Sequence, residues 1–191
     1  MTAFDATRRR SPLDGTVLPA GLRGEPFLAQ VDLRLDPDDG AATAAAAGVL
    51  GLALPLTPNT VASAGDVAAL WLGPDEWLIV APAGGETALE AGLRDALGPA
   101  HHSVVDVSAN RVVLELSGPR TREILEAGCS IDLHPRVFGP GRCAQTFLAR
   151  ANVTLWQLAD GAEPAYRLFV RPSFAAYLVA WIADASIGLE S

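Results

Sequence analysis

Residues 67–82, VAALWLGPDEWLIVAP, form the stretch that decides the fold. Apolar and β-branched residues on both sides of a Gly-Pro-Asp run predict two strands, 67–72 and 77–81, joined by a tight turn. Residues 155–172, LWQLADGAEPAYRLFVRP, have the same plan with a longer turn. The sequence therefore predicts two hairpins of one kind, one in each half of the chain.

The segments around the first hairpin complete one unit. Residues 27–35 alternate apolar and polar side chains, which predicts a half-buried strand. The Ala-rich run 37–50 predicts a helix with acidic residues in its first turn, and 61–64 a short strand. Leu89, Leu93 and Leu97 recur at helical spacing and predict a helix. That helix is expected over residues 86–97.

The second half repeats this order. We expect strands over 103–107, 111–116, 143–148, 153–158 and 166–170, and helices over 119–127 and 173–185. The prediction is an α+β protein of two similar, pseudo-duplicated β-α-β-β-β-α lobes. Chance similarity between two amphipathic hairpins is the alternative to duplication.

The expected domains follow from these elements. The first lobe spans 27–100 and the second 101–186. Residues 1–26 contain three prolines and no periodicity, which predicts an extended N-terminal arm: either a disordered tail or an arm that orders against a partner subunit. Residues 187–191 are expected to form a tail.

Composition restricts the classes of partner. The chain has 191 residues and a net charge of −8, and an acidic chain repels phosphate backbones, so nucleic acid is not an expected partner. No apolar run is long enough to span a bilayer, and no apolar stretch follows the N-terminal arginines as a secretory signal requires. Two cysteines, Cys129 and Cys143, fit inert buried thiols in a reducing compartment. We therefore expect a cytoplasmic protein without a membrane partner.

The histidines do not predict a metal or catalytic site. His101 and His102 are adjacent in a strand and should face opposite ways. His134 lies in Asp132-Leu133-His134-Pro135, where an acid-oriented base and a capped turn are both possible, and the turn is favoured. No phosphate-binding loop and no Gly-x-Ser-x-Gly motif occurs. We therefore assign no catalytic, cofactor-binding or metal-binding residue.

Several motifs carry a family resemblance. LWLGPDEWL at 70–78, VDVSANR at 105–111, and LSGPR at 116–120 with DLHP at 132–135 resemble the gamma subunits of heterotetrameric bacterial sarcosine oxidase. From Asp106 onward the chain is similar to the folate-binding domain of the glycine-cleavage T-protein superfamily. This resemblance implies that the two pseudo-duplicated lobes form a T-protein-like folate-binding-domain fold.

The resemblance implies a role inside a complex. That complex demethylates sarcosine to glycine, passes the one-carbon unit to tetrahydrofolate and reduces O2 to H2O2. Alpha, beta and delta subunits would be the partners, and FAD, FMN, NAD, tetrahydrofolate and zinc would lie in those other subunits.

The chain departs from the superfamily at one point. No Asp or Glu occurs between Cys143 and Leu158, where the superfamily carries a critical acidic residue. The resemblance thus implies a non-catalytic subunit that supports assembly. A stand-alone folate-dependent one-carbon enzyme and a T-protein-like assembly factor are the alternatives. The candidate interface residues are Trp71, Asp75, Trp77, His134 and Arg136.

Overall fold

The computed structural model describes residues 9–25 and 27–187. The first lobe is built on a five-stranded antiparallel sheet with the order β3-β4-β5-β2-β6. Its elements are β2 (Ala29–Leu35), α1 (Gly40–Leu50), β3 (Val61–Ala64), β4 (Val67–Gly73), β5 (Glu76–Ala81), α2 (Glu86–Leu97) and β6 (His102–Asp106).

The second lobe has its own five-stranded antiparallel sheet with the order β1-β7-β10-β9-β8. Its elements are β1 (Leu22–Glu25), β7 (Val112–Ser117), α3 (Thr121–Glu126), β8 (Cys143–Leu148), β9 (Ala151–Ala159), β10 (Ala165–Val170) and α4 (Pro172–Ile187). With its two sheets and its helices, the chain confirms the predicted α+β class.

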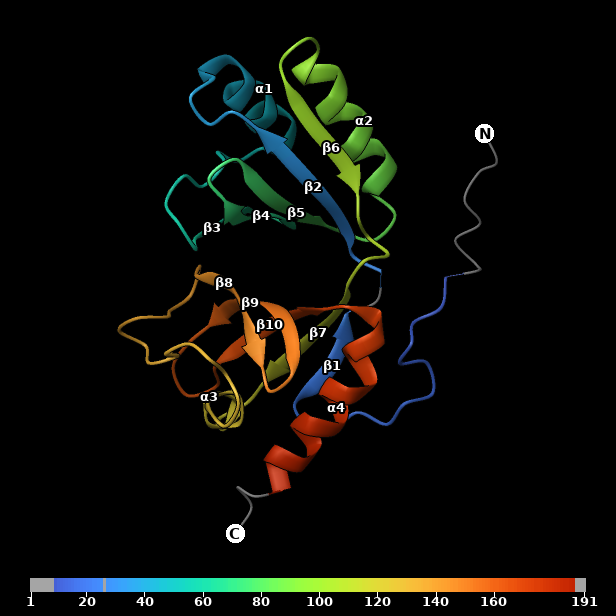
Figure 1. Cartoon of the computed structure of the whole chain (residues 1–191), viewed down its shortest axis with the longest axis vertical. Coiled ribbons are helices and arrows are strands. Elements are labelled where there is room, and N and C mark those ends of the chain that lie inside the picture. The colour runs from blue at the N-terminus through green and yellow to red at the C-terminus, as the bar shows by residue number, and fades with distance from the viewer. Residues whose placement is uncertain (1–8, 26, 188–191) are drawn as a thin grey trace.

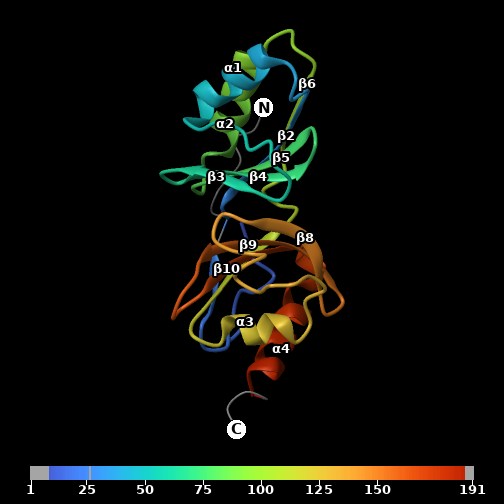
Figure 2. The same ribbon diagram turned by 90° about the vertical axis from the view of Figure 1, so that its left-hand side faces the viewer.

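The elements form four layers. Helices α1 and α2 cover the outer face of the first sheet, and α3 and α4 cover the outer face of the second (Figures 1 and 2). The two sheets face one another in the middle, where Leu70, Leu78, Trp156 and Phe169 belong to one buried apolar cluster. Because the lobes pack sheet against sheet, a polar residue on these inner faces can be buried, as Gln30 is.

Alternation along β2 explains this packing. Val31, Leu33 and Leu35 pack in the apolar cluster beneath α1 and α2. Successive side chains of a strand point to opposite faces, so Gln30 and Asp32 face the second lobe. Helix α1 begins at Gly40, three residues after the predicted start at 37, because Asp39 caps it and accepts hydrogen bonds from the amides of residues 41 and 42. The acidic residues therefore precede the helix and do not lie in its first turn.

The structure differs from the expected domain boundaries in two places. Strand β6 pairs with β2, so the first sheet continues to Asp106, beyond the expected boundary at 100/101. Strand β1 lies within the expected arm 1–26 and pairs with β7. Both are edge strands whose partners are distant in sequence. The sequence predicted the strand that forms β6 but not its pairing with β2, and it did not predict β1. Residues 1–8 of the arm and 188–191 of the tail lie outside the described residues.

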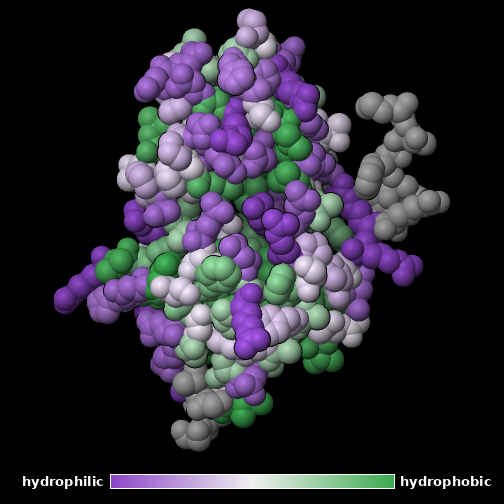
Figure 3. All heavy atoms as spheres, viewed as in Figure 1, coloured by the Kyte–Doolittle hydropathy of each residue, from purple (hydrophilic) through white to green (hydrophobic). Residues whose placement is uncertain are grey.

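The molecular surface combines hydrophilic and hydrophobic residues. On the face shown in Figure 3, hydrophilic and hydrophobic residues are interspersed. Among the described residues, no helix combines the length and the apolar character needed to cross a bilayer.

Candidate functional site

A cavity of about 560 Å³ lies where the two lobes meet the N-terminal segment. It is lined by residues 9–14, by the start of β2, by the first turn of α2 and by the connection between β6 and β7. A volume of this size is within the range of small-molecule pockets, about 300–1,000 Å³. The cavity is therefore the candidate functional site.

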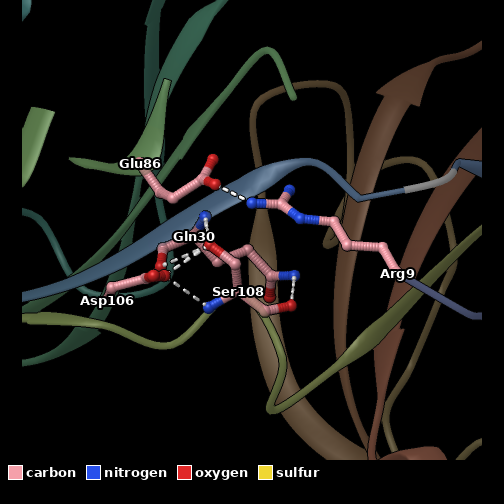
Figure 4. A network of polar contacts seen from close by, with 5 residues as sticks. All are labelled: Arg9, Gln30, Glu86, Asp106 and Ser108. Atoms are coloured by element: carbon pink, nitrogen blue, oxygen red, sulfur yellow. Dashed lines mark hydrogen bonds and ion pairs between the residues drawn. The ribbon is translucent and has the colours of Figure 1, made fainter. Parts of the chain in front are cut away.

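The Asp106-Val107-Ser108 motif fixes one wall of the cavity (Figure 4). Asp106 Oδ1 accepts hydrogen bonds from the Ser108 hydroxyl at 2.6 Å and the Ser108 amide at 2.9 Å. Ser108 Oγ in turn accepts from the Gln30 backbone amide at 2.9 Å. The motif thus ties the connection between the lobes to the start of β2.

Gln30 is the buried polar residue of this wall, only 1% exposed. Its Nε2 donates to the Arg111 carbonyl at 3.1 Å and lies 3.5 Å from the Ser108 carbonyl. The sequence analysis placed Gln30 on the polar face of its strand and did not anticipate this burial. Alternation gives the face correctly, but it does not reveal that a second sheet covers that face.

Glu86 forms the opposite wall (Figure 4). It occupies the first turn of α2, where the helix dipole favours a carboxylate, and one of its oxygens is ion-paired with Arg9 of the N-terminal segment. Glu86 Oε2 and Gln30 Oε1 are buried without a hydrogen-bond partner among the described residues. Two acceptors therefore remain unsatisfied in the cavity walls.

Arg111 adds a cation to the cavity lining. Burial is the main cause that lowers its pKa, and Arg171 contributes in the same direction. Within the part of the chain that the structure describes, its guanidinium forms no hydrogen bond or ion pair. The carboxylates of Asp32 and Glu76 act on this guanidinium in the opposite direction and raise its pKa.

Asp32 lies on the same face of β2 as Gln30. Burial is the largest cause that raises its pKa, and repulsion from Glu76 adds to it, while Arg34 and Arg111 act in the opposite direction. The folded state therefore holds the proton of Asp32 more tightly than the unfolded chain does. The stability of the fold is lost as the pH rises from the pKa of Asp32 in the unfolded chain through its higher pKa in the folded chain.

Asp32→Asn is accordingly expected to stabilise the chain at pH 7. The difference from the unchanged chain should vanish near pH 3, where Asp32 is protonated in both states. Urea midpoints at the two pH values measure it, with Asp95→Asn, an exposed position on α2, as the control. A variant that is less stable at pH 7 would contradict the expectation.

The two tryptophans of the hairpin, Trp71 and Trp77, differ in their exposure, and only Trp71 has surface that a partner could contact. Trp77 is fully buried, and its Nε1 donates to the Pro55 carbonyl at 2.8 Å. Its assignment to an interface is therefore wrong, because its ring and its N–H are both used inside the lobe. Trp71 lies opposite Trp77 in the register and packs against the same cluster, but is only partly buried.

Asp75 is half exposed and forms a two-point ion pair with Arg34, at 2.9 and 3.0 Å.

His134 and Arg136 are exposed in a turn. Asp132 Oδ1 accepts from the His134 amide at 2.8 Å, and His134 Nδ1 accepts from the Arg136 amide at 3.2 Å. These bonds agree with the capped turn rather than with an acid-oriented base. Among the described residues, no group of three or more His, Cys, Asp or Glu could hold a metal ion.

The two cysteines differ more than the sequence indicated. Cys143 is buried between the lobes, and burial raises its pKa to about 12, whereas Cys129 is partly exposed. Iodoacetamide at pH 8 is expected to modify Cys129 at least about a hundredfold faster than Cys143, because the thiolate is the reactive form. Peptide mass spectrometry measures this, and both should react in urea. Equal rates in the folded chain would contradict the burial of Cys143.

The fold defines the class to which the chain belongs. It matches the aminomethyltransferase T of the glycine cleavage system from Bartonella henselae with a TM-score of 0.64 at 15% identity, over 90% of this chain and 47% of that one. At this identity the likeness shows the fold: the chain is a two-lobed α+β protein with the architecture of part of a T-protein.

The particular family is shown by closer matches. The model of the sarcosine oxidase gamma subunit family matches residues 34–188. A sarcosine oxidase subunit gamma from Corynebacterium sp. (strain P-1) is 44% identical over 86% of this chain and 78% of its own length. A solved heterotetrameric sarcosine oxidase from Corynebacterium sp. U-96, in complex with pyrrole 2-carboxylate, matches with a TM-score of 0.84 and 36% identity, over 96% of this chain and 97% of that chain. The chain belongs to the sarcosine oxidase gamma subunit family.

Proposed function

We propose that this chain is the non-catalytic gamma subunit of a heterotetrameric sarcosine oxidase and contributes to its assembly. The observation that carries the proposal is the match to a chain of that complex over 96% of this chain with a TM-score of 0.84. Sarcosine would be demethylated to glycine by the complex, in the cytoplasm.

The partners under this proposal are alpha, beta and delta subunits. FAD, FMN, NAD, tetrahydrofolate and zinc would be held by those subunits. Membership of the gamma subunit family and the match to a chain of a heterotetramer support this division.

We further propose that the two lobes arose by duplication, with the first lobe covering residues 27–107. Support comes from the order of strands: β3-β4-β5-β2-β6 in one sheet corresponds to β8-β9-β10-β7-β1 in the other. Under this proposal β1 takes the place of β6, although it comes from the opposite end of the chain. The second lobe then consists of residues 108–187 together with β1.

Two exposed regions are proposed as contact surfaces with the other subunits. In the turn that holds His134 and Arg136, Val137 is 56% exposed. On α4, Phe174 and Tyr177 are 39% and 38% exposed and pack edge to face, with ring centroids 6.4 Å apart. Exposed apolar side chains beside charged ones are typical of the centre and rim of interfaces.

Coexpression of the tagged chain with the larger subunits tests the proposal. The unchanged chain is expected to copurify with them, and Val137→Asp combined with Phe174→Asp should reduce recovery at least about tenfold, since a charge in an apolar contact is unfavourable. Leu56→Asp, at an apolar position of the first lobe that is 59% exposed, is the matched control and should copurify normally. If the unchanged chain is monodisperse alone and does not copurify, the proposed function is wrong.

A further inference from the structure

We propose that residues 9–21 form a strap that is anchored on the second lobe, latched to the first lobe through Arg9, and able to open one side of the cavity between the lobes. The inference goes beyond the proposed function and does not rest on it, because it follows from contacts within this chain. Figure 1 shows the N-terminal segment leaving the start of β1 and running along one side of the molecule, and Figure 4 shows Arg9 reaching Glu86 of the first lobe.

The strap is anchored on the second lobe at its C-terminal end. Leu13 is 9% exposed and belongs to the apolar core of that lobe, and Leu18 packs against the same core. Where the strap enters β1, the Gly21 carbonyl accepts a hydrogen bond from the Ser117 amide at 2.9 Å. A Cβ at Gly21, whose φ is +78°, would overlap the Ser117 carbonyl oxygen, so this close approach needs glycine. The C-terminal end of the strap therefore moves with the second lobe.

The N-terminal end of the strap is attached to the first lobe by a charge pair. Arg9 forms an ion pair with Glu86 in the first turn of α2, and the two side chains are 20% and 7% exposed. Removing one member of a buried ion pair leaves the other charge without compensation, which is more unfavourable than the loss of an exposed pair. The pair is therefore able to hold the strap against the first lobe.

The part of the strap near the latch forms one side of the cavity. Residues 9–14 line the cavity together with Leu18, while β2, α2 and the connection between β6 and β7 supply the other sides. Among the described residues, residues 11–16 donate their backbone hydrogen bonds only within this segment, such as the bond from the Thr16 amide to the Leu13 carbonyl at 2.9 Å. Lifting this part away from α2 would break no strand pairing. Segments with few hydrogen bonds to the rest of a protein are the first to open locally.

The two attachments respond differently to a change of charge. The anchor depends on apolar burial and on the pairing of β1 with β7, whereas the latch depends on the carboxylate of Glu86. Loss of that carboxylate should release residues 9–12 from α2 while Leu13 stays buried. The strap then acts as a lid that is hinged near Leu13, and its release widens the entrance to the cavity.

Limited proteolysis of the full-length chain with trypsin tests the latch. Trypsin cuts after arginine, and the rate of cleavage follows the population of the open segment when opening and closing are fast. Glu86→Gln removes the latch without changing the cleavage site, and it should raise the rate of cleavage after Arg10 at least about tenfold. Intact-mass spectrometry over time measures this rate. Equal rates in the unchanged chain and in the variant would overturn the latch.

Two controls separate release of the strap from loosening of the whole fold. Glu90→Gln makes the same change of charge about one helical turn later on α2, where Glu90 is paired with Arg94 at 2.8 Å, and should leave cleavage after Arg10 unchanged. Arg23 lies within β1, so cleavage after Arg23 requires the sheet to open and should be equally slow in all three chains. If Glu86→Gln raises both cleavage rates alike, the chain unfolds as a whole and the strap is not a separate element.

Binding of an apolar dye tests whether release of the strap opens the cavity. The chain that trypsin has cut after Arg10 lacks the latch but keeps Leu13 and β1, and melting curves by circular dichroism check that it is folded. Anilinonaphthalene sulfonate should fluoresce at least about threefold more with this cut chain and with Glu86→Gln than with the intact chain, while Glu90→Gln should match the intact chain. Unchanged fluorescence in the folded, cut chain would mean that the strap does not control access to the cavity, and would overturn the proposal.

Discussion

Trp77→Ala is expected to lower the free energy of unfolding by about 3–5 kcal/mol, which is the usual cost of removing a buried aromatic side chain. Trp77 is 0% exposed and belongs to the cluster between the first sheet and its helices. The substitution also leaves the Pro55 carbonyl without the indole N–H that donates to it at 2.8 Å. Because this is a large part of a typical domain's stability, the variant should be partly unfolded at 37 °C. Urea unfolding followed by fluorescence and circular dichroism measures the loss.

Trp71→Ala is the matched control for this prediction. Trp71 lies opposite Trp77 in the register of β4 and β5, but it is only partly buried, and within the part of the chain that the structure describes its indole N–H donates no hydrogen bond. Its loss should cost clearly less than the loss of Trp77. Equal costs would mean that the two rings contribute alike, and that the burial of Trp77 does not dominate the stability of the first lobe.

The hairpin shows how far the sequence predicts the fold. The turn at Gly-Pro-Asp and the strands beside it follow from local residue preferences, and β8 and α2 begin and end where the sequence analysis expected. Local patterns could not show that Trp77 is enclosed while Trp71 is only partly so. The carbonyl that accepts from the Trp77 indole belongs to Pro55, 22 residues earlier in the chain, so local patterns do not reveal this contact.

Gly128→Ala is the second substitution with a large expected effect. A Cβ at this position would lie 2.5 Å from Trp181 Cζ2 and 3.2 Å from the Ala149 amide nitrogen. The ring of Trp181 packs from α4 against the core of the second lobe, so it cannot move away without disturbing that packing. Such overpacking costs about 1–3 kcal/mol. A lower urea midpoint and a lower melting temperature are the expected results.

Gly48→Ala provides the control for this substitution. Gly48 lies within α1, and a Cβ there meets nothing within 4 Å. Alanine is the better helix former, so this variant should gain about 0.5–1 kcal/mol. If both variants are stabilised, the contact between Gly128 and Trp181 is looser in solution than in the structure.

The cavity was less predictable than the fold. The Asp106-Val107-Ser108 motif was visible in the sequence, but only as part of a family resemblance. Gln30, Glu86 and Arg111 are far apart in sequence and are brought together because β2, α2 and the connection before β7 meet at the lobe junction. Each is an ordinary polar residue in its own segment. Only the packing of one sheet on the other brings them to the wall of one cavity.

The pairing of β1 with β7 has a consequence for synthesis on the ribosome. β1 leaves the ribosome before every other strand, yet its partner β7 follows only after the entire first lobe. The first sheet, contiguous from Ala29 to Asp106, can close while the second is still being made. The loop that β1 must close is long, and non-local strand pairing is slow. The earliest strand to be synthesised is therefore expected to be among the last to pair, and until then the edge of β7 is open to incorrect partners.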